Sequence, residues 1–371
     1  MTTRILALVS DCYGVGGGIA RYNQDLFEAL AGTAPDSVEI VVLPRHGSAD
    51  GTSMPSSITQ LPAVRGRIAY SVAAIRTAWS RRPFDIVFCG HPFMAPLALM
   101  AARLIGARSW MQAHGTDIVF DRRASVRRAM EAADMVTTVS RDTRARLLEW
   151  TDVLPDRARV LPDTVRDLFT PGTPSPELVA RLKPGPGPVL LTVARLSAAE
   201  RYKGHEQVFA AVAELRKRFP DLVYLVAGDG DDRARLEARA RELGCANGAV
   251  RFLGYLPERD LLDLYRLTNV FVMPSTREGF GIAYLEAAAC GVRVVGAHGG
   301  GSADAIPDGR VGALVEAGDT EALVAAIAGQ LAAGKADISA VEPYRHRHFA
   351  GAANRLLARL LARPCRMSGS S

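Results

Sequence analysis

Two cationic side chains in the second half of the chain have the types and spacing needed to bind a diphosphate. Arg195 follows the apolar run 189–194, and Lys203 stands eight residues later in the sequence Tyr-Lys-Gly-His. An arginine presents a planar fork of donors and a lysine a compact charge, so the pair could hold a pyrophosphate from two sides. Lysine makes up only 4 of the 45 basic residues, which favours a specific role for Lys203 over loop solubility.

A glycine-containing segment further along the chain carries two carboxylates. Glu278 and Glu286 have seven residues between them, and a helix of 3.6 residues per turn would place them about two turns apart on one face. One could hold sugar hydroxyls and the other a ribose diol. The backbone N–H groups at the start of this helix would face an anion; they belong to Gly279, Phe280, Gly281 and Ile282. The helix is otherwise apolar, so Glu286 needs a polar partner.

The first half of the chain offers weaker signals. Gly16 and Gly17 lie in a glycine cluster between an apolar run and a helical pattern, where backbone amides could approach an anionic group. Ile19 stands where a dinucleotide-binding G-x-G-x-x-G would need its last glycine. His114 ends another apolar run, in His-Gly-Thr-Asp, and is either a ligand for sugar hydroxyls or part of a turn stabilised by Asp117. The Asp-Gly-Asp at 229–231 reads as a turn before a helix, so no metal site is expected.

The elements that must position these residues are short apolar runs that alternate with amphipathic stretches. Strands are predicted at 4–9, 38–43, 85–89, 109–113, 135–139, 158–161, 189–194, 222–227, 249–253, 269–273, 292–296 and 311–315, and helices at 19–30, 208–219, 233–243 and 320–332. This alternation predicts an α/β protein with two Rossmann-like, doubly wound domains. In such sheets ligands bind at the carboxyl ends of the strands, so we expect both domains to face a central cleft.

Proline sets the expected domain boundary. The segment 171–188 is rich in proline and glycine, which predicts a linker at 166–185 between an acceptor-side domain at 1–165 and a nucleotide-sugar domain at 186–340. An arginine-rich helix at about 344–363 could pack back on the first domain. Five scattered cysteines and an N-terminal apolar run too short for a signal peptide indicate a cytoplasmic protein.

Charge is unevenly distributed along the chain. The formal net charge of +6 is mild and predicts no nucleic-acid partner, but the segment 60–129 holds eleven arginines and three aspartates, a local +8. Ile68, Val72 and Ile75 form a helical stripe bordered by Arg65, Arg67 and Arg76. Either this stripe meets an anionic membrane surface, with a peripheral position on the inner face of the cytoplasmic membrane, or it faces the domain core and the arginines are solvated.

Along nearly its whole length the sequence resembles retaining glycosyltransferases of the GT-B fold, specifically glycosyltransferase family 4. The resemblance rests on GVGG, HGTD, VARL, YKGH, AGDG, FLGYLP and PSTREGFGIAYLEA, and its strongest part is the pair of glutamates in the last motif. One departure is Gly299-Gly300-Gly301-Ser302-Ala303-Asp304, where many relatives have Gly-Gly-x-Pro-Glu. The contacts made by that loop stay open.

The resemblance implies roles for the residues singled out above. Gly16 and Gly17 would lie near the donor phosphates and the acceptor, and His114 would contact the transferred sugar. Arg195 and Lys203 would bind the pyrophosphate, and Glu278 would contact the sugar. Glu286 would bind the ribose, and Tyr255 would lie where the base is received.

The reaction implied is metal-independent transfer of a hexose, with retention, from a nucleotide-diphosphate sugar that is the co-substrate; no further cofactor is implied. The acceptor would be a saccharide or a lipid-linked molecule in polysaccharide or glycolipid biosynthesis. Mannose from GDP-mannose is favoured over a sugar from UDP or ADP. A nucleotide-sugar 2-epimerase is the main alternative, and an NAD-dependent dehydrogenase or a sugar-nucleotide-binding protein without activity is less favoured.

Overall fold

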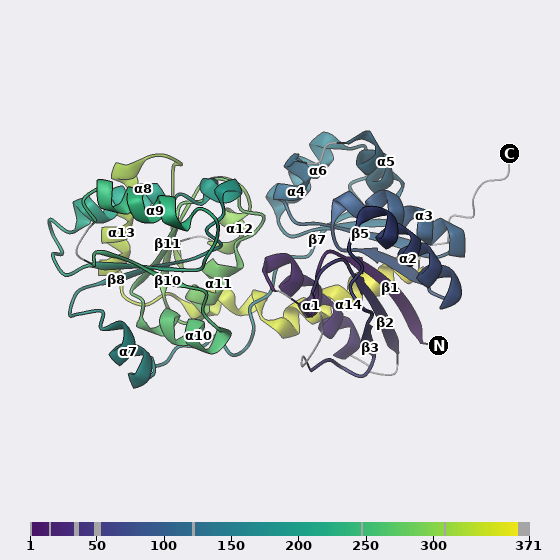
Figure 1. Ribbon diagram of the computed structural model, residues 1–371, viewed down its shortest axis with the longest axis horizontal. Coiled ribbons are helices and arrows are strands. Elements are labelled where there is room, and N and C mark those ends of the chain that lie inside the picture. The colour runs from purple at the N-terminus through teal and green to yellow at the C-terminus, as the bar shows by residue number, and fades with distance from the viewer. Residues whose placement is uncertain are drawn as a thin grey trace. The chain divides into compact units, whose positions relative to one another are not determined.

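The chain folds into two α/β units, one of residues 1–164 with 346–371 and one of residues 165–345 (Figure 1). The computed structural model describes residues 2–14, 16–32, 37–47, 53–120, 123–245, 248–307 and 309–362. Both units contain a sheet of parallel strands with helices on its two faces, so the predicted fold class is confirmed.

The described residues of the first unit form a seven-stranded sheet with the order β3-β2-β1-β4-β5-β6-β7. Its strands are β1 (Thr3–Val9), β2 (Val38–Pro44), β3 (Ile58–Gln60), β4 (Ile86–Cys89), β5 (Arg108–Ala113), β6 (Met135–Thr138) and β7 (Ala158–Val160). Only β3 was not predicted. The sheet grows outward from β1 through β2 to β3 and then resumes on the other side of β1 with β4. In open α/β sheets, a reversal of this kind is where ligands bind.

Helices cover both faces of this sheet. They are α1 (Gly18–Gly32), α2 (Arg67–Ser80), α3 (Ala95–Ile105), α4 (Thr116–Phe120), α5 (Ala124–Ala132), α6 (Arg141–Trp150) and α14 (His346–Ala362), with a 3₁₀ turn η1 at Pro92–Met94. Strand residues alternate between faces, and Leu6 and Leu8 of β1 share one core with α2, α3 and α5. On the other face α14 lies beside α1, where the Asn354 side chain donates to the Ala29 carbonyl at 3.1 Å.

The second unit repeats this plan with the strand order β10-β9-β8-β11-β12-β13. Its strands are β8 (Val189–Val193), β9 (Val223–Ala227), β10 (Val250–Gly254), β11 (Val270–Met273), β12 (Arg293–Ala297) and β13 (Gly312–Val315). The reversal falls between β8 and β11, which are paired through Val270 and Leu190. The candidate residues Arg195 and Glu278 follow these two strands, so they leave the sheet at its switch point.

The helices of the second unit are α7 (Pro176–Leu182), α8 (His205–Leu215), α9 (Arg233–Glu242), α10 (Glu258–Leu267), α11 (Ile282–Ala289), α12 (Ser302–Ala305) and α13 (Thr320–Ala332), with 3₁₀ segments η2 (Ala198–Lys203) and η3 (Ile338–Tyr344). The proline-rich segment expected to be a linker holds α7, which packs on α10. Arg181 of α7 forms an ion pair with Asp260 of α10, with 2.7 Å between the atoms.

Candidate active site

The centre of the candidate site is an ion pair between Lys203, the last residue of η2, and Glu278, in the loop between β11 and α11. The Lys203 Nζ lies 3.1 Å from Glu278 Oε1, and each side chain is 13% exposed. Burial by itself would lower the pKa of Lys203, but the carboxylates of Glu278 and Glu200 outweigh burial and hold that pKa above its ordinary value. Lys203 is therefore a fixed positive charge at neutral pH.

Glu200 connects the two predicted cations. Its Oε2 lies 3.7 Å from Lys203 Nζ, and its Oε1 accepts a hydrogen bond from the Arg195 guanidinium. The Arg195 side chain is 76% exposed, so it can leave this carboxylate at little cost. Sequence reasoning missed Glu200, since a single acid in a polar loop carries no periodic or motif signal.

Backbone contacts hold the Lys203 loop against the Glu278 loop. The Thr276 N–H donates to the Tyr202 carbonyl at 3.0 Å. Gly204 has φ +78°, and a Cβ there would lie 2.7 Å from the Pro274 carbonyl oxygen, so only glycine allows this approach. The close passage of these two loops brings Lys203 and Glu278 together.

The triple glycine that departs from the family pattern packs directly on Glu278. The Gly301 N–H donates to the Glu278 carbonyl at 2.7 Å. Gly300 has φ +62°, and a Cβ there would meet that same carbonyl oxygen at 2.2 Å. This loop therefore fixes the backbone of Glu278, a role the sequence left open.

The expected geometry of the two glutamates is wrong. Helix α11 begins at Ile282, so Glu278 lies before the helix rather than two turns along the same face as Glu286. Gly281, with φ +100°, turns the chain into the helix. Phe280 is buried, with its ring 5.7 Å from that of Tyr344, so it anchors the loop while Gly279 and its neighbours present backbone.

Glu286 has the polar partner that its apolar helix required. The Tyr265 hydroxyl, from α10, donates to Glu286 Oε2 at 2.8 Å. Burial and the adjacent Glu286 charge raise the pKa of Tyr265 well above its usual value, so the phenol remains the donor. Tyr255, predicted near the base, follows β10 and is 80% exposed.

Gly16, Gly17 and His114 belong to the first unit. Both glycines have positive φ, +90° and +109°, in the turn from β1 into α1. His114 follows β5, with its Nε2 3.0 Å from the Gly90 carbonyl oxygen and its ring 5.2 Å from that of Tyr22. Burial lowers the pKa of His114 to about 4, so the imidazole is neutral near pH 7.

The acid that follows His114 has a structural role. Asp117 accepts the backbone N–H of His114 at 2.9 Å and that of Ile118 at 2.9 Å. The turn is thus stabilised by Asp117, as one of the two sequence interpretations proposed. The imidazole itself bonds to Gly90, so the two residues do not act as a side-chain pair.

Acidic side chains elsewhere are used in turns. The Asp229 carboxylate accepts a hydrogen bond from the Gly230 N–H at 2.9 Å. The Asp231 carboxylate accepts one from the Ala198 N–H, also at 2.9 Å. In the described ranges no group of three or more His, Cys, Asp or Glu side chains could hold a metal ion.

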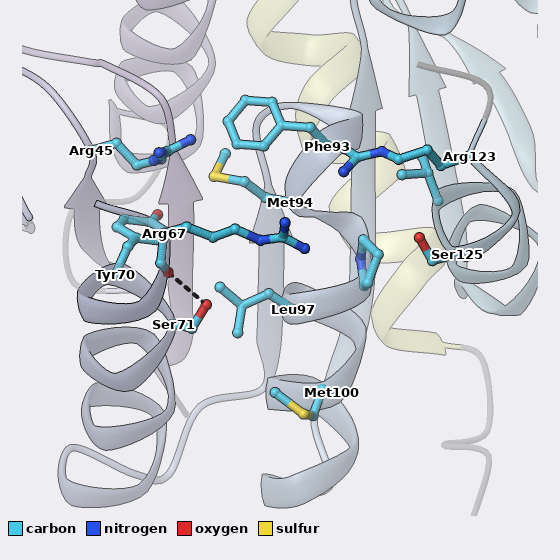
Figure 2. Close-up of a pocket in the computed structure, with 12 residues that line it drawn as sticks. Arg45, Arg67, Tyr70, Ser71, Phe93, Met94, Leu97, Met100, Arg123 and Ser125 are labelled. Atoms are coloured by element: carbon cyan, nitrogen blue, oxygen red, sulfur yellow. Dashed lines mark hydrogen bonds between the residues drawn. The ribbon is translucent and has the colours of Figure 1, made fainter. Parts of the chain in front are cut away.

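A pocket of about 410 Å³ lies in the first unit and contains none of the predicted catalytic or donor-binding residues (Figure 2). Its rim carries Arg45, Arg67 and Arg123, and its floor includes Leu97 and Met100. Arg67 and Arg123 belong to the basic segment 60–129 and Arg45 lies outside it, so the sequence did not predict that the three line one pocket. Over the part of the chain that the structure describes, no helix is long and apolar enough to cross a bilayer.

Comparisons with known proteins agree with this architecture. Residues 177–338 match the family model "Glycosyl transferases group 1", and residues 16–167 match "Glycosyltransferase Family 4". Sucrose-phosphate synthase from Thermosynechococcus elongatus, 22% identical, superposes with a TM-score of 0.82 over 97% of this chain and 99% of that one. Anabaena HepE in complex with UDP-glucose, 19% identical, superposes with a TM-score of 0.77 over 96% of this chain and 99% of that one. These likenesses confirm the GT-B fold.

Curated relatives share more sequence over shorter spans. A GDP-mannose-dependent alpha-(1-6)-phosphatidylinositol monomannoside mannosyltransferase from Mycolicibacterium smegmatis is 34% identical over 64% of this chain and 65% of its own length. A D-inositol 3-phosphate glycosyltransferase from Corynebacterium urealyticum is 34% identical over 52% of this chain and 47% of its own length. The chain thus spans between about half and two thirds of the length of these relatives.

Proposed function

Because the chain belongs to glycosyltransferase family 4, we propose that it transfers a hexose from a nucleotide-diphosphate sugar to a saccharide or lipid-linked acceptor. The transfer retains the anomeric configuration and needs no metal ion. The observation that carries the proposal is the Lys203–Glu278 contact at the switch point of the second sheet, with Arg195 joined to it through Glu200. GDP-mannose is the favoured donor, supported by the similarity to a GDP-mannose-dependent mannosyltransferase that is 34% identical over 64% of this chain.

Positive charge for the diphosphate comes from three sources in the second unit. Lys203 is a buried fixed cation, Arg195 is an exposed fork, and the backbone N–H groups from Gly279 to Ile282 lie at the start of α11. Charge that develops on the leaving diphosphate would be stabilised by donors already in place, which is the usual source of the largest catalytic effect. This charge supply supports a reaction without a metal.

Carboxylates in the same unit would bind the sugar and the nucleoside. Glu278 accepts from Lys203 through Oε1, so its carboxylate is held rigidly where a sugar hydroxyl would meet it. Glu286, fixed by Tyr265, would accept the hydroxyls of the ribose. Tyr255 would receive the base on its exposed ring.

His114 would bind the transferred sugar as a neutral ligand. Its Nε2 faces the Gly90 carbonyl, an acceptor, so the proton belongs on this nitrogen and Nδ1 is an acceptor. A pKa of about 4 keeps this state over the physiological range. Since His114 is uncharged and Glu278 is engaged by Lys203, neither is placed as a covalent nucleophile, and the acceptor hydroxyl would attack from the face that the diphosphate leaves.

A basic, partly apolar surface of the first unit supports an acceptor at a membrane. Ile68 is 81% exposed and Val72 61% exposed, so the interpretation that the stripe faces the core is wrong for these two residues. Ile75, the third residue of the stripe, is partly buried and packs against the core. The buried side of α2 instead consists of Tyr70, Ala74 and Ala78. We place α2 on the anionic inner face of the cytoplasmic membrane, in a peripheral position.

Cations surround this exposed apolar stripe. Arg65, Arg67, Arg76, Arg81 and Arg82 are all exposed, and Arg82 stacks 3.9 Å above the ring of Trp79; Arg122 of the same basic segment lies outside the described residues. Each cation near an anionic surface contributes about 1 kcal/mol, so a few acting together suffice for reversible attachment.

A screen of nucleotide sugars tests the donor half of the proposal. GDP-mannose should raise the melting temperature more than UDP- or ADP-sugars, because a ligand that binds the native state stabilises it by mass action. A larger increase in melting temperature with a UDP- or ADP-sugar would identify that sugar as the donor and leave the proposed type of reaction unchanged. Conversion of the sugar without any acceptor would favour the 2-epimerase instead.

A further inference from the structure

The pocket of the first unit combines a cationic rim with an apolar floor (Figure 2). It lies where β2 and β4 end and where α2, α3 and α5 begin, and none of its residues belongs to the proposed donor site. The inference below concerns the acceptor and so rests on the proposed function.

Three guanidinium groups converge on the upper part of this pocket. Figure 2 shows the side chains of Arg45 and Arg67 on the left of the pocket and that of Arg123 on its right. No acidic side chain is among the described residues that line it, and Arg45 and Arg67 make no ion pair with a described carboxylate. The like charges of Arg45 and Arg67 repel each other unless an anion lies between them.

Arg45 is held ready for such an anion by aromatic rings. Its guanidinium lies 5.1 Å from the centre of the Phe93 ring and 5.8 Å from that of Tyr70. Its Nε is buried and has no hydrogen-bond partner among the described residues. A buried donor without a partner costs free energy, which a phosphate oxygen would recover.

The lower part of the pocket is apolar. Met94 and Leu97 line it, and Met100, 53% exposed, lies at its open end. Ser71 is shared with a shallow groove between α2 and α3, which is lined by Val72, Trp79 and Leu104. An apolar path therefore leads from the arginines to the exposed stripe of α2.

We propose that this pocket binds a single anionic phospholipid, with the headgroup phosphodiester among the three arginines and an acyl chain along Leu97 and Met100. The pocket volume falls in the range typical of small-ligand sites. A free sugar phosphate would satisfy the rim but leave the apolar floor unused. The site would thus select an acceptor that is still anchored in the membrane.

Binding of a monomeric lipid tests this proposal without any glycosyl transfer. Dihexanoylphosphatidylglycerol, kept below its micellar concentration, is titrated into the full chain and followed by calorimetry, with glycerophosphoglycerol as the same phosphodiester headgroup without tails. The lipid should bind at least about tenfold more tightly than glycerophosphoglycerol, because the chains bury apolar surface. Equal affinity would overturn the lipid part of the proposal, and absence of lipid binding would overturn all of it.

Two exposed positions give variants that should fold normally. Arg67→Gln removes a rim cation and Met100→Glu places a charge on the apolar floor; each should weaken lipid binding about tenfold, the usual scale for a lost charge-assisted bond or an unpaired charge in a site. Arg103→Gln, on α3 outside the pocket, is the matched control and should bind as the wild type does. Lipid affinity unchanged in both pocket variants would contradict the assignment.

Titrations with GDP, UDP and ADP and with their sugars, in the same samples, separate this proposal from the proposed function. Lipid binding without any nucleotide or nucleotide-sugar binding would leave the pocket assigned and remove the glycosyltransferase proposal. Normal GDP binding without lipid binding would do the reverse.

Discussion

Lys203 and Glu278, which are 75 positions apart in the sequence, meet with 3.1 Å between Nζ and Oε1. The contact joins the loop after β8 to the loop after β11, the two strands at which the second sheet changes direction. Both charges lose hydration when they are buried, and this cost offsets much of their attraction. Such an ion pair therefore fixes the positions of the two side chains more than it stabilises the fold. Under the proposed function, these two side chains would bind a diphosphate sugar.

Replacing Lys203 tests the cationic side of this pair. Lys203→Ala should lower GDP affinity by more than about tenfold, because charge-assisted bonds to phosphate contribute roughly 1.5–3 kcal/mol. Lys217→Ala is the control, since Lys217 is an exposed lysine of the same unit that pairs with Glu214. Calorimetry that gives equal GDP affinity for wild type and Lys203→Ala would remove Lys203 from the diphosphate site.

The Glu200 carboxylate contacts both cations that would bind the diphosphate in the proposed site. It contacts both Arg195 and Lys203, so bound phosphate must displace or accommodate this carboxylate. Glu200→Gln should therefore tighten GDP binding severalfold, whereas Glu214→Gln, at the pair with Lys217, should not change it. Weaker GDP binding by Glu200→Gln would show that Glu200 positions the cations rather than competes for them.

Histidine burial makes the folded state sensitive to acid. Burial first, and the charge of Lys203 second, lower the pKa of His205 from 6.5 to about 4, and neither ring nitrogen has a hydrogen-bond partner among the described residues. The unfolded chain binds a proton at this imidazole more readily than the folded chain does. Acid therefore favours unfolding: the stability of the fold is unaffected by this group above about pH 6.5 and falls as the pH decreases towards 4.

The variant His205→Leu measures that loss. The free energy of unfolding, measured in urea titrations, should fall between pH 7 and pH 5 by about 2 kcal/mol less in this variant than in the wild type. His298→Leu, at an exposed histidine of the same unit, should follow the wild type. An identical pH dependence for His205→Leu and the wild type would contradict the assignment.

We expect the proposed membrane attachment through α2 to depend on apolar side chains as well as on charge. The double variant Ile68→Glu, Val72→Glu should reduce co-sedimentation with phosphatidylglycerol vesicles, as should replacement of Arg65, Arg67, Arg81 and Arg82 by serine. Leu154→Glu, at another exposed leucine of the first unit, should leave it unchanged. Wild-type binding should weaken in high salt, and wild-type protein that stays in the supernatant at low salt would exclude a membrane site.

Chelation tests the metal-independent reaction. Transfer activity should persist in EDTA, because Lys203, Arg195 and the start of α11 supply the positive charge. Loss of activity in EDTA that Mn²⁺ restores would contradict this expectation.

The strands could be predicted from the sequence because parallel strands covered on both faces read as apolar runs. Strand β3, of three residues at the sheet edge, has too short a run to stand out. Arg195 and Lys203 could be selected as candidate diphosphate ligands because a rare lysine and an arginine flank one loop. Their link through Glu200 could not be predicted, since it depends on where a single side chain turns.

The stripe on α2 shows why an amphipathic pattern left two readings open. Ile68 and Val72 are larger than the alanines of α2, yet Tyr70, Ala74 and Ala78 form the buried face. Small alanines face the alanines of α3 and let the two helices approach closely, which leaves the larger residues outside. Spacing of one Tyr and two Ala at every fourth position was the signal that could have distinguished the faces.

The transfer of radiolabelled mannose from GDP-mannose to an anionic lipid extract tests the central claim most directly. The wild type should move label into a lipid product of retained configuration, and the Glu278→Gln variant should lose that transfer while keeping a wild-type melting profile. If label never leaves the nucleotide with any GDP-, UDP- or ADP-sugar, or if it transfers equally well in Glu278→Gln, the assignment of this site to glycosyl transfer is wrong.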